Sequence, residues 1–569
     1  MRSHVVFAQA EQDWNHGMPF RGQTGYIAVS SRDEISTNFC NIHTLKFSTL
    51  DADALKPKIN NYLLLGFGYH ARLVMKHALQ MRTWLSRQFL SWRAANKGIC
   101  SSFCFTTRTR FNFLQNSRFI QSHYSTVSAE NVEYEYIDEV EDISRYQPGG
   151  YHPIHIDDRL NKRYRIVHKL GYGSYSTVWL AFDEKLGTYV AIKVGTSSAD
   201  CKEANILSQL SQSPVRGDVW EDKTLLIPAV LDSFDVSGPN GTHPCLVTHP
   251  ARCNLRDAKE ASGYRLFQLD AARSLAAQLV MALSLIHDRG YAHGDLHLGN
   301  FFLQLPSSLD NLSVEELYAR YGQPDKEPVV CLDPNAPSKN PSVPSYAITP
   351  AWLGAPSTDI PLSEAMLILS DFGVAFRPGD KSRLKSHTPL VMRPPESLFE
   401  PETPLTFASD IWSLGCVIFE LLAHRSLISG YFLETQDEMT AAQVHLQGPM
   451  PPTWWKKWDN RSMYYDEEGK PLGPPYDHWS WERKFREWVQ SPRQRWGTGT
   501  LAEDELDEVM KLLQRMLAWK PSERLDIYSV LNSEWMTRWA LPAYKKGLEA
   551  RCAVALSSGS DTGGVTLGA

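Results

Sequence analysis

The stretch His-Gly-Asp-Leu-His-Leu-Gly-Asn, residues 293–300, decides how the rest of the chain is interpreted. It opens with His293 and places Asp295 five positions before Asn300. A carboxylate and an amide at this spacing on one loop can direct two oxygen-bearing side chains toward one point. Because such pairs also arise by chance, the interpretation depends on the motifs that precede and follow it.

Length and composition limit the class of protein. With 569 residues the chain is too long for one hydrophobic core, so we expect a two-lobed domain with appendages. The hydrophobic share of 43% and the charged share of 21% are ordinary, and the net charge of -6 does not indicate nucleic-acid binding. The nine cysteines have neither metal-ligand nor disulfide-framework spacing. No apolar run reaches the length of a membrane span, so we expect no span. The mild net charge is the reason that we expect no direct nucleic-acid partner.

Residues 81–129 form a basic segment. Between positions 54 and 129 there is no Asp or Glu, but there are eleven Lys or Arg residues. Arginines alternate with apolar residues over 81–93, and Ser- and Thr-rich sequence follows, which is typical of a mitochondrial transit peptide. One interpretation is a transit peptide over 81–125 that starts at Met81, with residues 1–80 as an extension. The alternatives are a disordered basic tail and a folded domain.

Two segments flank the part that is expected to fold. Residues 130–163 begin with an acidic run and continue with turn-forming residues, which favours a linker. Residues 541–569 form a C-terminal tail, and its Ser-, Gly- and Thr-rich sequence from Ala553 onward favours disorder.

The first clear elements are a hairpin with a glycine loop. Residues 164–182 have the pattern of strand, loop and strand, and the loop contains Gly171 and Gly173. These glycines allow the backbone to approach phosphate groups closely, and Val178 would cover a nucleotide base. Ser176 replaces the third glycine of the G-x-G-x-x-G pattern, so an ordinary glycine hairpin is the alternative.

A lysine and a carboxylate follow at a spacing that favours a pair. Lys193 ends the β-branched run Val-Ala-Ile-Lys, which is typical of a strand. Glu203 lies ten residues later on a helical pattern. Residues 245–251 predict the last strand of this lobe, with Thr248 beside the base pocket. A solvated strand lysine is the alternative for Lys193.

Beyond residue 250 the pattern becomes mainly helical. Residues 269–289 predict a buried helix that delivers the 293–300 loop, and a short strand should follow that loop. Residues 306–364, rich in Pro, Ser, Asn and Asp, predict a spacer outside the core with one short helix at 314–321. Met-Leu-Ile-Leu-Ser-Asp-Phe-Gly then predicts a strand that ends at Asp371.

Three later features complete the series. Arg-Pro-Pro-Glu ends at Glu396, and Arg524 could pair with that carboxylate. Residues 409–421 predict a buried helix whose Asp410 anchors the 293–300 loop from below. Residues 433–500 form a second insert with many tryptophans, for which packing within the insert is favoured over a binding surface.

In this order the motifs indicate a eukaryotic-type protein kinase fold. The expected class is α+β, with a β-rich small lobe over 164–250 and a mainly helical large lobe over 251–540. Over residues 149–540 the chain resembles the SR-protein kinases, in the group that also holds the cyclin-dependent and MAP kinases. The similar segments are Gly-Gly-Tyr-His-Pro-Ile at 149–154, the glycine loop, and Arg393 before the final Glu of its motif. The resemblance implies Ser/Thr phosphorylation, often of Arg/Ser-rich splicing factors, with ATP and Mg²⁺.

The kinase pattern implies a role for each candidate residue. Asp295 would accept the proton of the substrate hydroxyl, Lys193 would hold the ATP phosphates, and His297 would lie beside the γ-phosphate. Asn300 and Asp371 would bind magnesium. The residues expected to bind the nucleotide are Leu170, Gly171, Gly173, Ser176, Val178, Ala191, Lys193, Glu203 and Thr248.

Two positions depart from the usual kinase motif. Gly294 replaces the arginine that commonly binds a phosphorylated activation loop. We therefore expect activity without phosphorylation of Ser382, Ser386 or Thr388. His297 replaces a lysine, and a neutral histidine would supply less charge beside the γ-phosphate.

Three functional classes stay open. A protein kinase is favoured by Glu396, Asp410 and Arg524, which are typical of the protein-kinase large lobe. The form His-Gly-Asp-Leu-His-x-Gly-Asn also resembles aminoglycoside- and choline-type small-molecule kinases. A pseudokinase scaffold is the third class, and the intact catalytic residues weigh against it. By resemblance we expect a monomer in the cytoplasm and nucleus, or a mitochondrial protein if 81–125 is a transit peptide.

Overall fold

The computed structural model describes residues 4–5, 29–30, 133–200, 202–211, 223–333, 340–379, 383–429, 435–472 and 479–559. The first two ranges are short strands, β1 (His4–Val5) and β2 (Val29–Ser30), which pair antiparallel. The ranges from residue 133 onward belong to a second unit, to which the rest of this description applies. Segment 81–125, for which a transit peptide or a disordered tail is expected, lies outside the described residues.

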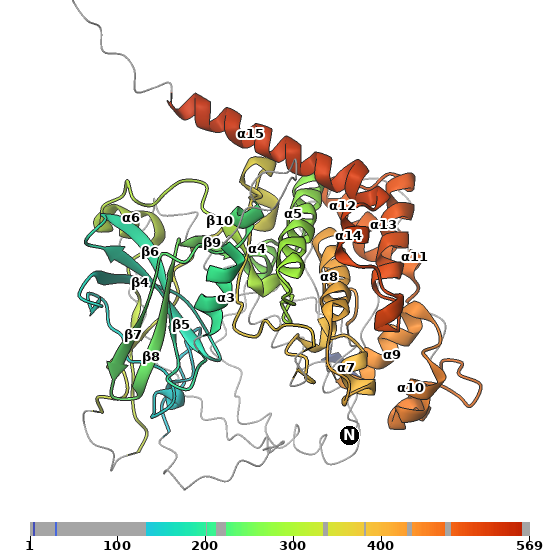
Figure 1. The fold of residues 1–569 in the computed structure, drawn as a ribbon, viewed down its shortest axis with the longest axis horizontal. Helices are drawn as coiled ribbons and strands as arrows, with labels where there is room; N and C mark the ends of the chain where they lie inside the picture. Colours follow the sequence, from blue (N-terminus) through green and yellow to red (C-terminus); the bar gives the residue numbers. More distant parts are fainter. Residues whose placement is uncertain are drawn as a thin grey trace, which may run out of the picture. The chain divides into compact units, whose positions relative to one another are not determined.

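A six-stranded antiparallel sheet forms one part of this unit (Figure 1). Its strands lie in the order β3-β4-β5-β6-β8-β7. The predicted strand at Tyr164 and the glycine loop after it are confirmed, since β4 begins at Tyr164 and β5 begins after the loop. The bounds are β3 (Arg159–Leu160), β4 (Tyr164–Gly173), β5 (Ser176–Asp183), β6 (Thr188–Gly195), β7 (Asp232–Gly238) and β8 (Gly241–Thr248).

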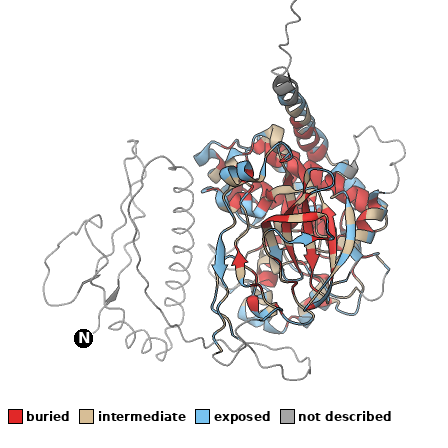
Figure 2. Ribbon diagram, turned by 90° about the vertical axis from the view of Figure 1, so that its left-hand side faces the viewer, coloured by how far each residue is buried: buried red, intermediate tan, exposed pale blue. Residues whose placement is uncertain are grey.

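Helices form most of the other part, and their inner faces are buried (Figures 1 and 2). The helix predicted at 269–289 is confirmed as α5, and almost all of its residues are buried. By length and composition α5 could cross a membrane, but 89% of its apolar window is buried inside the protein, as in a core helix. The helices are α3 (Lys202–Ser211), α4 (Leu255–Ala261), α5 (Leu269–Asp288), α6 (Val314–Tyr321), α7 (Glu396–Phe399), α8 (Phe407–Leu422), α9 (Gln436–Gln447), α10 (Pro452–Lys457), α11 (Trp481–Lys484), α12 (Ser491–Trp496), α13 (Glu503–Met516), α14 (Ile527–Leu531) and α15 (Leu541–Gly559).

A three-stranded sheet brings the catalytic loop next to the Asp-Phe-Gly motif. Its strands are β9 (Ala251–Asn254), β10 (Phe301–Gln304) and β13 (Leu367–Leu369), in the order β13-β10-β9. The short strand expected after Asn300 is therefore confirmed. Phe301 faces Leu369 in the antiparallel ladder. Asn300 and Asp371, which flank these two residues, consequently lie at the same end of the sheet.

Two buried side chains bind backbone carbonyls at the C-terminal end of α8. Lys259 donates to the carbonyls of Glu420 and Ala423, and Arg493 donates to the carbonyl of Leu422. The last carbonyls of a helix have no partner within the helix, and these two side chains satisfy them.

The tryptophans of the second insert are mostly packing residues, as expected. Trp454, Trp458, Trp481 and Trp488 are all buried. Trp454 and Trp458 belong to one apolar cluster with Trp519. For these residues the interpretation as packing anchors is confirmed.

The prediction that the 306–364 spacer lies outside the core is wrong, although its short helix is confirmed as α6. Leu309, Leu317 and Leu353 are buried and pack with residues of β4, β5 and β6. The spacer also forms a strand pair, β11 (Lys326–Pro328) with β12 (Tyr346–Ile348). Outside α6 the spacer contributes single buried leucines, such as Leu309 and Leu353, from irregular segments, so no helical or strand period marks them in the sequence.

The acidic run expected to be a linker also contributes to the core. Glu141 pairs with Lys169 of β4, and their side chains are only 2% and 1% exposed. The Tyr146 hydroxyl donates to the same carboxylate. At the other end of the chain, α15 continues to Gly559, so disorder from Ala553 onward is wrong for residues 553–559.

The spacer packing predicts a stability difference between two faces of α6. Leu317→Ala should lower the free energy of unfolding by about 2–5 kcal/mol, because a fully buried leucine leaves a cavity. Glu315→Ala, on the exposed face, should change it by about 0.5 kcal/mol or less. Urea unfolding followed by tryptophan fluorescence measures both. Similar small effects for the two variants would contradict the packing role.

Candidate active site

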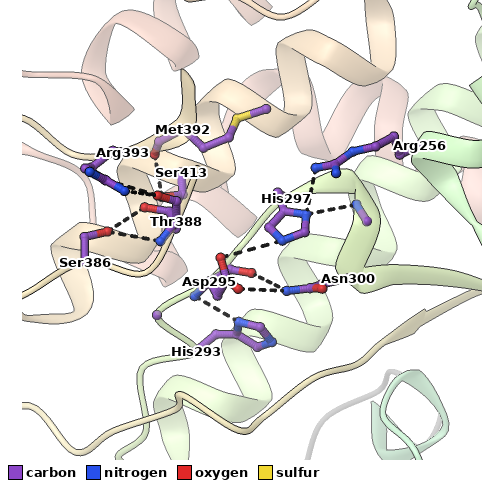
Figure 3. Close-up of polar contacts among 12 residues, drawn as sticks. Arg256, His293, Asp295, His297, Asn300, Ser386, Thr388, Met392, Arg393 and Ser413 are labelled. Atoms are coloured by element: carbon purple, nitrogen blue, oxygen red, sulfur yellow. Dashed lines mark hydrogen bonds and ion pairs between the residues drawn. The ribbon is translucent and has the colours of Figure 1, made fainter. Parts of the chain in front are cut away.

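The catalytic loop is held by hydrogen bonds within itself (Figure 3) and by one to the carbonyl of Ser370, which precedes the Asp-Phe-Gly motif. Asn300 Nδ2 donates to the main-chain oxygen of Asp295 at 2.9 Å and to its Oδ2 at 3.3 Å. His293 Nδ1 accepts from the Asp295 amide at 3.3 Å, so its Nε2 donates to the Ser370 carbonyl at 3.1 Å. Within the described residues, Asp295 Oδ1 is buried without a hydrogen-bond partner. This oxygen is therefore available to a substrate hydroxyl.

Asp410 supports the loop from below, as predicted. Its carboxylate accepts from the amides of His293 at 2.7 Å and Gly294 at 2.9 Å, and it contacts His287 Nε2 at 3.0 Å. Burial alone would raise the pKa of Asp410, but the hydrogen bond and the charge of His287 outweigh burial and lower it. The carboxylate thus stays ionised as an acceptor for the two amides.

Lys193 lies between two carboxylates. Its Nζ is 2.7 Å from Glu203 Oε2 on α3 and 2.9 Å from Asp371 Oδ1. Glu203 Oε1 also accepts from the Phe372 amide at 3.0 Å, and Phe372 is fully buried. Burial alone would lower the pKa of Lys193, but Glu203 and Asp371 outweigh burial and raise it above its ordinary value. The lysine is consequently held as a cation between α3 and the Asp-Phe-Gly motif.

The residues expected around the nucleotide lie in register on adjacent strands. Gly171 faces Val178, and Gly173 faces Ser176 across the glycine loop. Val178 faces Lys193 on the next strand, and Ala191 faces Thr248 on the strand after that. Leu170 precedes the loop on β4 and packs in part against the spacer cluster. The strand register therefore brings these residues to one region of the sheet.

Tyr151 is a contact to the glycine loop that the sequence analysis missed. Its hydroxyl donates to the Gly173 carbonyl at 2.7 Å and accepts from Arg145 at 3.0 Å. Tyr151 is nearly fully buried and comes from the segment before the first kinase strand. The resemblance of Gly-Gly-Tyr-His-Pro-Ile to the corresponding family segment was the signal that could have identified it.

The side chains expected to bind magnesium fit that ion. Asn300 uses its amide nitrogen toward Asp295, which leaves the amide oxygen for a metal. The Asp371 side chain is 47% exposed while Oδ1 holds Lys193. Oxygen donors of this kind are the ligands that Mg²⁺ prefers. Asp371 has φ +67°, a left-handed backbone conformation that is uncommon for residues other than glycine.

His297 lies beside the catalytic aspartate. Its Nε2 is 3.6 Å from Asp295 Oδ1, and its Nδ1 accepts from the Gly299 amide at 3.1 Å. The ring therefore caps the 3₁₀ turn η6 (Leu298–Asn300) that carries Asn300. The side chain predicted to lie near the γ-phosphate is thus next to Asp295, the expected proton acceptor.

The activation segment is held by contacts within the protein (Figure 3). Arg393 donates twice to the Thr388 carbonyl, at 3.1 and 2.9 Å, and the Thr388 hydroxyl contacts Ser386 at 2.5 Å. Gly294 has φ +78°, and a Cβ there would lie 3.1 Å from the Phe376 ring. An arginine at position 294 would therefore be strained. Ser382 lies outside the described residues.

A buried ion pair closes the large lobe, as predicted. Arg524 binds Glu396 with two hydrogen bonds, at 2.8 and 2.6 Å. Both residues are buried, and the Arg524 side chain is fully inaccessible. Bidentate pairs of this kind fix geometry as well as charge. The pair joins the end of the activation segment to the C-terminal helices.

Comparisons with known proteins agree with this architecture. Residues 360–536 match the protein kinase domain family. The chain is 27% identical over 417 residues to a serine/threonine-protein kinase SRPK of Physarum polycephalum. The aligned residues cover 70% of this chain and 91% of the relative. It is 35% identical over 170 residues to the serine/threonine-protein kinase spk-1 of Caenorhabditis briggsae, covering 30% and 15% of the two chains. It is 33% identical over 168 residues to the human SRSF protein kinase 3, covering 29% and 30%.

The two-lobed fold, the catalytic loop and these matches define a serine/threonine protein kinase. Small-molecule phosphorylation is not favoured. Among protein kinases, the chain is similar to the SRPK-type kinases over most of its length.

The contact from Tyr151 predicts an effect on ATP binding. Tyr151→Phe removes one hydrogen bond, worth about 0.5–1.5 kcal/mol, from the carbonyl of the phosphate-binding loop. The KM for ATP should rise roughly two- to tenfold with a smaller change in kcat. Tyr136→Phe is the control, because the Tyr136 hydroxyl binds Asp138 on the surface and should not matter. Equal KM values for both variants would exclude the loop-holding role.

The activation segment predicts activity without phosphorylation. The triple variant Ser382→Ala, Ser386→Ala and Thr388→Ala should retain most of the rate, because Arg393 binds the main chain of Thr388 and not its side chain. Arg393→Ala should lower the rate, since it removes both hydrogen bonds. Initial rates of phosphate transfer by the full chain decide this. Loss of most activity in the triple variant would refute the expectation.

Proposed function

We propose that this protein kinase uses ATP and Mg²⁺ to phosphorylate serine residues in Arg/Ser-rich proteins. The observations that carry the catalytic part are the continuous contacts from Glu203 through Lys193 to Asp371, and the buried Asp295 Oδ1, which accepts no hydrogen bond within the described residues. The substrate part is supported by the family and by the name of the human relative, an SRSF protein kinase.

In this proposal the substrate hydroxyl binds Asp295 Oδ1. The hydroxyl oxygen forms a bond to the terminal phosphorus of ATP while the bond to the leaving ADP oxygen breaks, and Asp295 takes the hydroxyl proton. Asn300 orients Asp295 through the other carboxylate oxygen. Asp410 keeps the loop in place by binding the two amides that precede Asp295.

Lys193 and the glycine loop hold the ATP phosphates in this scheme. Glu203 fixes the lysine, and Tyr151 fixes the loop. Magnesium bound at Asn300 and Asp371 would neutralise charge on the phosphates. Since the transition state is loose, positioning and charge neutralisation account for most of the expected rate enhancement.

Phosphate transfer from labelled ATP by the full chain tests the proposal. An Arg/Ser-repeat peptide should be phosphorylated, and a Lys/Ser-repeat peptide of equal charge should be a poorer acceptor because lysine lacks the planar, five-donor guanidinium group. Asp295→Asn should reduce the rate by about 10²–10⁴-fold, because it removes the proton acceptor.

Two outcomes would contradict the proposal in different ways. Equal phosphorylation of both peptides, or a preference for serine peptides with acidic flanks, would reject the Arg/Ser preference. Undiminished transfer by Asp295→Asn would reject the assigned catalytic residue. The Arg/Ala-repeat peptide, which has no hydroxyl group, serves as the acceptor control.

A further inference from the structure

His297 stands at a position where the kinase motif usually has lysine. Two hydrogen-bond donors from other residues lie on one side of its ring. Nδ1 is 3.1 Å from the Gly299 amide nitrogen and 3.1 Å from Nη2 of Arg256 (Figure 3). An amide N–H and a guanidinium can only donate, so Nδ1 must offer its lone pair. A neutral ring held in this way carries its proton on Nε2.

The Nε2 atom faces the reacting groups. It lies 3.6 Å from Asp295 Oδ1, the buried oxygen that has no hydrogen-bond partner in the described part of the chain. At this distance Nε2–H does not occupy the oxygen, which stays free for a substrate hydroxyl. The same N–H can donate to a phosphate oxygen placed next to that hydroxyl.

Arg256 comes from a different element of the fold. It is the second residue of α4, whose N-terminus is capped by Asn254. Leu255 and Ala258 are fully buried and fix the helix, while Arg256 itself is exposed. The helix therefore presents the guanidinium at the rear of the His297 ring without burying it.

Gly299 leaves room for this contact. A Cβ at position 299 would lie 2.9 Å from Cε1 and 3.0 Å from Nδ1 of His297, and 3.4 Å from Cζ of Arg256. The first of these distances is shorter than side chains tolerate, so any residue larger than glycine would displace the ring. Glycine thus permits both the short turn and the Arg256–His297 hydrogen bond.

We propose that Arg256 is a positioning residue for phosphoryl transfer, which holds His297 as the Nε2–H tautomer with this proton directed toward Asp295 and the transferred phosphoryl group. Arg256 also provides a fixed positive charge behind the ring. Two residues together take the place of the single lysine. The inference rests on the proposed phosphoryl transfer and adds a residue that the kinase motifs do not contain.

Four forms of the full chain test the coupling between Arg256 and His297: the parent, Arg256→Ala, His297→Lys and the double variant. Arg256→Ala should lower kcat by roughly tenfold or more, with little change in the KM for ATP, because a misplaced donor affects the reaction more than binding. In the His297→Lys background, Arg256→Ala should leave kcat unchanged or raise it. A lysine at position 297 has no tautomer to fix, and removing Arg256 relieves the repulsion between the two positive side chains. Equal losses in both backgrounds would overturn the proposal.

Two further variants separate the proposed role from general effects. Arg256→Lys retains a charged donor and should keep most of the rate. Arg265→Ala removes an exposed arginine whose partner is Glu260 at 3.9 Å, and it should behave as the parent protein. A loss for Arg256→Ala that Arg256→Lys does not rescue would show that this role is wrong.

A spectroscopic measurement decides the tautomer even if no transfer is found. In ¹⁵N-histidine-labelled full chain, the His297 signals, assigned by their loss in His297→Gln, should show a proton on Nε2 and none on Nδ1. Arg256→Ala should shift the signals toward a mixture of tautomers. A proton on Nδ1, or signals that Arg256→Ala does not change, would overturn the inference. Absence of transfer with the predicted signals would instead reject the proposed function.

Discussion

The buried carboxylate of Asp410 accepts the amides of His293 and Gly294 and contacts His287. It therefore ties α8 to the end of α5 and to the catalytic loop. An ionised group in the protein interior is tolerated only when hydrogen bonds replace its lost hydration. Here the donors that replace hydration are the backbone groups that position Asp295, so satisfying the buried charge and shaping the loop are the same interaction.

The small lobe depends on a second set of ion pairs. Lys193 joins β6 to α3 and to Asp371, while Lys169 joins β4 to Glu141 in the segment before the sheet. Tyr151 of that segment binds the Gly173 carbonyl. The glycine loop is thus supported from outside the usual kinase core, and the chain before residue 164 contributes to the structure of the nucleotide-binding region.

The fold and the grouping of the candidate catalytic residues could be predicted from the sequence, because phosphoryl transfer requires particular residue types at fixed spacing. The 293–300 loop, the strand after it, α5 and the pairing of Glu396 with Arg524 were all expected and are confirmed. The spacer was misjudged because part of its core comes from irregular segments outside α6. A single buried leucine such as Leu353 leaves no periodic pattern that distinguishes it from a loop residue.

The sequence by itself determined the order of the motifs and the identity of the candidate groups for the chemistry. It showed an aspartate, an asparagine and a lysine in the kinase arrangement, with a histidine where lysine is usual. Only the tertiary structure decided which groups surround that histidine. Arg256 is 41 residues from His297 along the chain, and the two meet because α4 packs on the turn η6 that carries Asn300. Contacts of this kind depend on the packing of separate elements, for which local spacing provides no information.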